Sequence, residues 1–114
     1  MPIRTRYTMT VDATSVATVG RWIPMDIYAV PFNVGFGAIV GSAGSGTIRV
    51  EHTFDNVFDA SITPTAFVHS DVSANSSNID GNYAYGVSAV RLVVASCASG
   101  GSTFALSLIQ TGSV

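Results

Sequence analysis

Two histidines and three aspartates are the side chains of this sequence that could build a metal or acid–base site. They are His52, His69, Asp55, Asp59 and Asp71. Imidazole nitrogens and carboxylates bind Zn²⁺, and both transfer protons near neutral pH. None of these residues follows the H-x-H, H-E-x-x-H or calcium-loop spacing of known sites. Alternation places His52 on the apolar side of a strand, so we expect a packed, hydrogen-bonded histidine and no metal or cofactor site.

Serine and cysteine are the candidate nucleophiles. No serine stands in the Gly-x-Ser-x-Gly elbow that joins a strand to a helix, and Ser45 lies between two glycines in an expected turn. Cys97 is the single cysteine, so it can form neither an intrachain disulfide nor a cysteine-based metal site. Its neighbours in the sequence offer no base or cation, which favours a small turn or core residue. We therefore predict that the protein is not an enzyme.

Aromatic side chains could form a sugar-binding surface, because an aromatic ring packs well against the apolar face of a pyranose. Tyr83 and Tyr85 follow the longest polar segment, residues 73–82, and alternation places them on one strand face. We expect this pair to be exposed to a partner, together with Asn75 and Asn78 of the polar segment.

Arg4 and Arg6 lie on the polar side of an alternating segment, residues 3–11. Two arginines do not form the clustered basic surface that a nucleic-acid backbone requires, and the net charge of the chain is −2. We predict no direct contact with nucleic acid. Residues 1–12 are expected to act as an arm that ties the two arginines to carboxylates of a partner, although simple exposure to solvent explains them equally well.

The composition of the chain is poor in charge. Of its 114 residues, 47% are hydrophobic and only 11% are charged, whereas a typical soluble domain has roughly a quarter charged. The length predicts a single domain, residues 1–114. Because charge keeps small monomers apart, we expect a homo-oligomer or a surface covered by partners. A monomer with a hydroxyl-rich surface is the alternative.

The N-terminal sequence lacks the apolar segment of a secretion signal, and no apolar run reaches the length of a membrane span. We therefore expect synthesis in the cytoplasm and no association with a membrane.

The elements that would position these residues are short strands. About eight of them, separated by Gly, Pro, Asn and Ser turns, predict an all-β antiparallel sandwich that resembles a jelly roll. The clearest signals are two strand–turn–strand units, residues 38–54 and 92–109, which predict hairpins.

Proline and glycine refine this arrangement of strands. Pro24 places its strand at a sheet edge or at a bulge, because proline cannot donate to a strand ladder. Gly35 and Gly37 leave one strand face bare, and we expect a backbone or a bulky ring to press against it. Asp80-Gly81 predicts a turn inside the mobile polar segment 73–82.

Several segments of the chain together resemble a family of small structural proteins of tailed-bacteriophage virions. The segments are residues 22–28, 31–37, 50–55, 80–84 and 89–92. The resemblance extends from about residue 20 to residue 112 and lies in turns and strand starts, with no catalytic signature. It implies a virion component that is made in the host cytoplasm.

Size and β content favour a capsid decoration, or cement, protein within this class. Such a protein binds the major capsid protein and neighbouring copies of itself, and it stabilises the head because small buried areas add over many sites. The alternative is a neck or tail component, or a small adhesin that presents residues 73–82 to a host glycan. A carbohydrate-binding module outside viruses is a third possibility.

Overall fold

The computed structural model describes residues 3–11, 18–41, 46–97 and 102–113. Within these ranges the chain forms nine β-strands and no helix, and so no helix long and apolar enough to cross a membrane. The strands are β1 (Ile3–Val11), β2 (Thr18–Val19), β3 (Ile23–Pro24), β4 (Val30–Ile39), β5 (Gly46–Thr53), β6 (Phe67–Val68), β7 (Ile79–Tyr83), β8 (Ala89–Cys97) and β9 (Ser102–Ser113).

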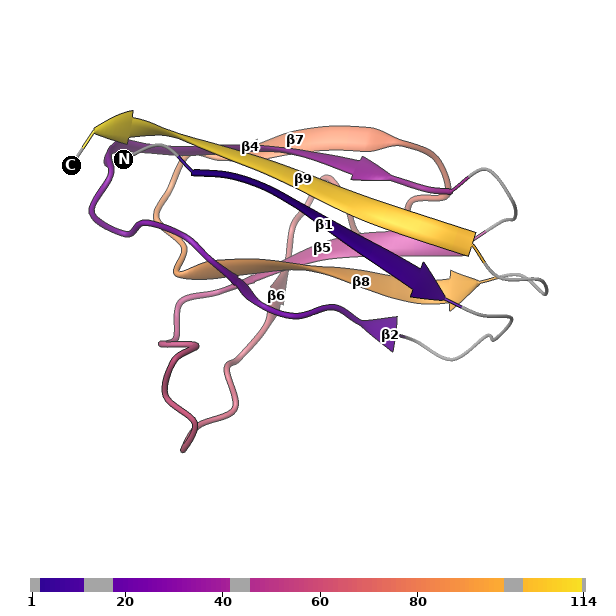
Figure 1. Cartoon of the computed structure of the whole chain (residues 1–114), viewed down its shortest axis with the longest axis horizontal. Helices are drawn as coiled ribbons and strands as arrows, with labels where there is room; N and C mark the ends of the chain where they lie inside the picture. The colour runs from indigo at the N-terminus through magenta and orange to yellow at the C-terminus, as the bar shows by residue number, and fades with distance from the viewer. Residues whose placement is uncertain (1–2, 12–17, 42–45, 98–101, 114) are drawn as a thin grey trace.

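The strands form two antiparallel sheets that pack face to face (Figure 1). One sheet has the order β1-β9-β4-β7, and the other has the order β2-β8-β5-β6, with β3 also paired to β8. β2 and β3 behave as one interrupted strand, because the Gly20 N–H between them donates to the carbonyl of Leu92 on β8. The eight resulting strands have the order of a jelly roll, which confirms the predicted fold class.

Both predicted hairpins are wrong. β4 and β5 lie in different sheets, and so do β8 and β9, so each strand–turn–strand unit crosses from one sheet to the other. A hairpin and a crossing have the same alternating sequence, because in both cases the apolar sides of two strands turn toward one core. The turns themselves, at residues 42–45 and 98–101, lie outside the described residues.

The edge strands of the two sheets bear on the expected N-terminal arm and on the expected position of Pro24. β1 is no arm, because every residue from Ile3 to Val11 pairs with β9. It is instead one of the two edge strands of its sheet. Pro24 does lie in an edge strand, as its missing N–H requires.

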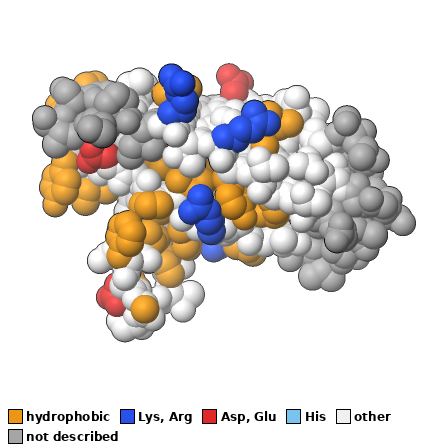
Figure 2. Space-filling model, in the orientation of Figure 1, with side chains coloured by type: hydrophobic (Ala, Val, Ile, Leu, Met, Phe, Trp, Pro, Cys, Tyr) orange, Lys and Arg blue, Asp and Glu red, His pale blue; other side chains and the backbone are white. Residues whose placement is uncertain are grey.

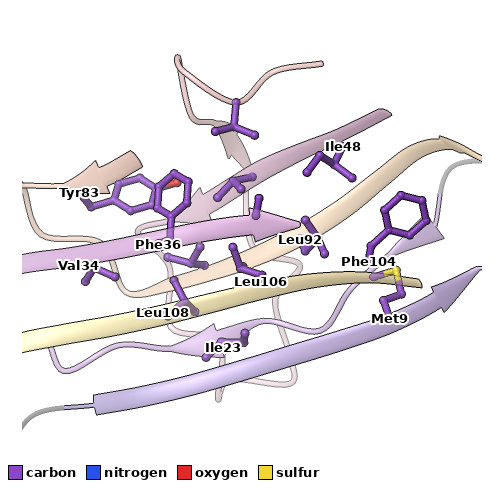
Figure 3. Packing of buried hydrophobic residues seen from close by; sticks show 14 of the residues in the cluster. Met9, Ile23, Val34, Phe36, Ile48, Tyr83, Leu92, Phe104, Leu106 and Leu108 are labelled. Carbon is purple, nitrogen blue, oxygen red and sulfur yellow. The ribbon is translucent and has the colours of Figure 1, made fainter. Parts of the chain in front are cut away.

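The core lies between the sheets and is made by the inward side chains of both (Figure 3). Phe36 of β4 and Leu106 of β9 meet Ile48 of β5 and Leu92 of β8, all of them buried. Burial of each such side chain stabilises the fold by about 1.5–3 kcal/mol. Cys97 is also buried in this cluster, which agrees with the core alternative of the expected turn or core residue.

Three glycines behave differently from their predictions. Asp80 and Gly81 form no turn, because both lie in β7, which pairs with β4. Gly81 is needed for packing: a Cβ there would lie 2.8 Å from Cζ of Phe36. A Cβ at Gly35 or Gly37 would meet no described atom within 4 Å, so nothing presses against that face.

Candidate functional site

Both histidines of the candidate metal or acid–base set make hydrogen bonds inside the fold. His52 is buried, and its Nδ1 lies 2.9 Å from the hydroxyl of Tyr83, which confirms the packed, hydrogen-bonded histidine. His69 is also buried, and its Nδ1 accepts from the Asp71 N–H at 3.1 Å while its Nε2 donates to the Asn82 carbonyl at 2.9 Å. No group of three or more His, Cys, Asp or Glu in the described ranges could hold a metal ion.

The environment of the His52–Tyr83 pair favours the neutral form of both side chains. Burial, reinforced by the nearby His69, lowers the pKa of His52. Burial, with smaller contributions from Tyr85 and Glu51, raises the pKa of Tyr83 far above its usual value. The neutral forms of an imidazole and a phenol can share the hydrogen bond between Nδ1 of His52 and the hydroxyl of Tyr83.

The predicted pair of exposed tyrosines is half wrong. Tyr83 is fully buried, with its ring against Phe36, His52 and His69. Tyr85 is 52% exposed and lies beyond the end of β7. Only Tyr85 of the pair is therefore available to a partner.

Of the other predicted partner contacts, the two arginines are exposed, and the two asparagines make contacts within the fold. Arg4 and Arg6 are exposed on β1. Asn75 is half-buried, and its backbone pairs with Ile48 of β5. The side-chain oxygen of Asn78 accepts from the N–H of Val40 at 2.9 Å, so this exposed asparagine fastens the segment before β7 to the end of β4.

A groove at one end of the sandwich is the most conspicuous surface feature of the described residues. Its volume is about 470 Å³. One wall is the β3–β4 connection, Met25 to Tyr28, and the other is Phe54 to Phe58 after β5, with Ser88 completing the lining. Tyr28 is 73% exposed and Phe58 is 79% exposed, so large apolar side chains face solvent on both walls. Hydrophobic side chains gather at the left end and over the projecting loop in Figure 2.

Hydrogen bonds within the loop between β5 and β6 hold the Phe54–Phe58 wall in place. This loop projects below the sandwich in Figure 1. Its neck is closed by the Thr65 N–H, which donates to Oδ2 of Asp55 at 2.7 Å. Nearer the groove, the Phe58 N–H donates to Oδ1 of Asn56 at 3.0 Å. Such side-chain-to-backbone bonds preorganise a loop, which lowers the entropic cost of binding through it.

The opposite wall is fixed by a buried glutamine. Gln110 of β9 is fully buried, and its amide group makes two hydrogen bonds of 2.8 Å with the backbone N–H and carbonyl of Asp26. Asp26 in turn accepts from the Tyr28 N–H at 3.0 Å. The wall that carries Tyr28 is thereby tied to the interior of the neighbouring sheet.

Aromatic rings continue from the groove toward β6. Phe54 contacts Phe67 at a centroid distance of 5.6 Å and Tyr85 at 6.4 Å. All three rings are about half exposed, and His52 lies beneath them. The groove and these rings together form a continuous apolar surface that could bind side chains of another protein.

Sequence reasoning missed the groove because its two walls are 26 residues or more apart in the chain. The local signal was two large apolar pairs that each follow a polar residue directly, Ile27-Tyr28 after Asp26 and Val57-Phe58 after Asn56. Alternation assigns faces within strands, and neither pair lies in a strand.

A cluster of two arginines and one glutamate pairs its charges within the chain. Arg49 and Arg91 both hold the carboxylate of Glu51, each with a nitrogen–oxygen distance of 2.6 Å, and Arg91 lies 4.1 Å from the ring centroid of Trp22. Burial alone would raise the pKa of Glu51, but the hydrogen bonds from Arg49 and Arg91 outweigh it and lower that pKa. These charges are occupied within the chain and leave the surface still poorer in charge.

Comparisons with known proteins add little to these observations. No family model and no curated protein matches the chain. Among solved structures, it is similar to a chain from Bacillus endospore appendages, described as a novel family of disulfide-linked pili. The two are 13% identical with a TM-score of 0.44, and the match covers 98% of this chain and 89% of the other. At this TM-score the likeness does not define the fold of the chain, which rests on the strand order given above.

Proposed function

We propose that this protein is a non-enzymatic structural component of a tailed-phage virion, which docks on its assembly through the aromatic groove. The observation that carries the proposal is the exposure of Tyr28 and Phe58 on two walls whose backbones are held by hydrogen bonds with side chains. Large apolar side chains that converge on an exposed groove are typical of protein–protein contact sites.

The chemistry of the groove favours a protein over a small polar ligand. Its lining is mainly apolar, and Oδ1 of both Asp26 and Asn56 accepts a backbone N–H within the groove walls. These bonds leave few free polar groups to orient a sugar or a nucleotide. We infer that the occupant is an apolar segment of a capsid subunit.

The virion setting rests on the resemblance of segments 22–28, 31–37, 50–55, 80–84 and 89–92 to small phage structural proteins. A charge-poor jelly roll without a disulfide suits a part that is made in the cytoplasm and used in many copies. The proposed mechanism is cementing: each copy bridges capsid subunits or neighbouring copies, and modest contacts add over the shell.

Binding of the purified protein to phage heads that lack it tests this proposal. The variant Phe58→Ser should bind about tenfold or more weakly, because a buried aromatic anchor typically contributes 2 kcal/mol or more. Ile62→Ser is the matched control, since Ile62 is 42% exposed in the same loop but does not line the groove. Equal binding by both variants, or no binding by the unmodified protein, would contradict the proposal.

A second candidate function is a neck or tail component, or an adhesin, that binds a host glycan. It is favoured by the exposed rings of Phe54, Phe67 and Tyr85, because such rings can stack on a pyranose. A glycan array tests this candidate with Tyr85→Ala as the binding-deficient variant. Retention of a sugar that depends on Tyr85, without binding to heads, would favour this function over cementing.

A further inference from the structure

The outer face of the β1-β9-β4-β7 sheet has a regular arrangement that the groove does not use. The pairing register aligns its side chains in rows that run across all four strands. In the order β1, β9, β4 and β7, one row consists of Arg4, Ile109, Gly35 and Asn82. The next row consists of Arg6, Ser107, Gly37 and Asp80. Each row begins with an arginine on edge strand β1 and ends with a polar or acidic residue on edge strand β7.

This face has a raised residue beside a bare one. Ile109 on β9 is 50% exposed, and Gly35 is its partner on β4. A Cβ at Gly35 would meet no described atom within 4 Å. In the next row, a hollow of about 300 Å³ lies beside Gly37 and reaches Asp80. The surface of this face therefore protrudes at β9 and is recessed at β4 and β7.

Positive and negative charges lie at opposite borders of this face. Arg4 and Arg6 lie at one border and Asp80 at the other, and all three are exposed. No ion pair joins any of them to another residue in the part of the chain that the structure describes. They make up half of the six exposed charged residues in that part, and the others are Arg21, Asp59 and Asp71.

We propose that this face binds the same face of a second copy of the chain, related by a two-fold axis that runs parallel to the strands between β9 and β4. That rotation reverses the order of the four strands and keeps each row in place. Ile109 of each copy then lies over Gly35 of the other. Arg6 of each copy lies over Asp80 of the other, where the hollow beside Gly37 receives the arginine side chain.

The shape of the sheet is compatible with this pairing. A rotation about an axis parallel to the strands preserves the handed twist, so two identical twisted faces remain parallel as they meet. Strands about 4.8 Å apart whose residues rise about 3.4 Å each, with β1 nine residues long and β7 five, give a face of about 500 Å² per copy. This area is at the low end for a specific complex, so we expect a dimer that dissociates on dilution.

The dimer face and the groove share no residue, so this inference does not depend on the proposed function. Phe58→Ser should leave dimer formation as in the unmodified protein. Loss of the dimer in Arg6→Asp should likewise leave the groove intact. Failure of one proposal is therefore distinguishable from failure of the other.

Sedimentation equilibrium with charge reversal tests the dimer. The unmodified protein should show a monomer–dimer equilibrium. Arg6→Asp should weaken it about tenfold or more, because two carboxylates would then face each other at each Arg6–Asp80 contact. Asp80→Arg should have a similar effect, and the double variant Arg6→Asp with Asp80→Arg should restore association. Ser76→Arg, an exposed change away from this face, serves as the control and should dimerise normally.

Gly35→Trp provides a second test that does not involve charge. Because the space above Gly35 is open in the described structure, this variant should still unfold in a cooperative thermal transition and yet remain monomeric. The proposal is overturned if the unmodified protein is a monomer at millimolar concentration. It is equally overturned if the dimer tolerates both Arg6→Asp and Gly35→Trp, or if the double charge reversal fails to restore it.

Discussion

At the scale of single residues, buried polar side chains set the shape of the groove. Gln110 lies inside the sandwich and holds the peptide group of Asp26, which begins the wall that carries Tyr28. The carbonyl of Asp26 also accepts from the Ala29 N–H, whereas its N–H has Gln110 as its partner. A residue with no exposed surface thus decides where an exposed aromatic side chain lies.

Gln110→Leu tests this positioning role. The substitution keeps the volume but leaves the N–H of Asp26 without its acceptor, which should cost about 1–3 kcal/mol of unfolding free energy. It should also weaken binding through the groove, since the Tyr28 wall is released. Chemical denaturation and binding to heads provide the two measurements. Thr111→Val, at the exposed neighbouring position, is the control, and equal stability of the two variants would contradict the role of Gln110.

His52 should make the stability of the protein depend on pH. Its pKa is lower in the folded protein than the ordinary value of 6.5, so below about pH 6.5 the unfolded chain binds more protons than the folded one. The free energy of unfolding should therefore be highest above this pH and should fall from pH 7 to pH 5. His52 packs against the rings of Phe54, Phe67 and Tyr83, and the nearby His69 acts in the same direction as burial.

His52→Gln separates the contribution of this residue to that pH dependence. Glutamine can still bond to the hydroxyl of Tyr83 but does not titrate. Thermal melts at pH 5 and pH 7 should differ less for the variant than for the unmodified protein. An identical difference in melting temperature would show that His52 is not the titrating group.

Sequence patterns at this scale located His52 correctly but misplaced Tyr83. Alternation in β5 gives the side of the strand on which His52 lies, and that side faces the core. The same rule placed Tyr83 and Tyr85 together on an exposed face. β7 ends at Tyr83, so the two tyrosines do not share one strand, and only the fold shows that the inner side of β7 meets Phe36.

At the scale of elements, the loop between β5 and β6 combines high exposure with internal hydrogen bonds. Such a loop can present Phe58 to a partner without first becoming ordered. Two of the three aspartates in the candidate metal set serve here as loop closures: Asp55 accepts from Thr65, and Asp59 accepts from Ser61. Those two hydrogen bonds from Ser61 lower the pKa of Asp59.

Asp55→Ala should loosen this loop without unfolding the sandwich. Loss of the bond to the Thr65 N–H should cost about 1 kcal/mol, and most of that cost should be local. Hydrogen exchange of residues 55–66 should become faster, while exchange in β8 stays slow. Thr63→Ala in the same loop is the control, and equal exchange in the two variants would rule out Asp55 as the closure.

β7 depends on a glycine that the sequence suggested as a turn. Gly81→Ala should destabilise the fold by about 1–3 kcal/mol, because the added methyl would overlap the ring of Phe36. Gly86→Ala is the matched control, since a Cβ there would meet no described atom within 4 Å. Urea unfolding compares the two variants, and equal midpoints would contradict the packing argument.

The elements also show where sequence patterns stop being informative. Short runs such as residues 46–53 and 89–97 were recognisable as strands, because their apolar and β-branched residues match a half-buried sheet. Which strands pair was not recognisable. The two proposed hairpins are crossings between sheets, since the register of long-range pairs depends on the whole fold and not on the turn alone.

At the scale of the whole molecule, the jelly roll was predictable and the groove was not. Many short strands with regular turns limit an all-β chain to a few architectures, and the strand order agrees with one of them. The groove arises where the β3–β4 connection meets the loop after β5, a contact between segments distant in sequence. Since a jelly roll supports many functions, the proposed role depends on this surface and not on the fold.

The copy number of this chain in purified phage particles tests the cementing role most directly. Quantitative mass spectrometry would compare it with the major capsid protein in the same particles. A decoration protein that docks through the groove should occur in a number comparable to that of the major capsid protein, and Phe58→Ser should lower this number sharply. A copy number as small as that of a neck or tail ring, or one unchanged by Phe58→Ser, would contradict the account.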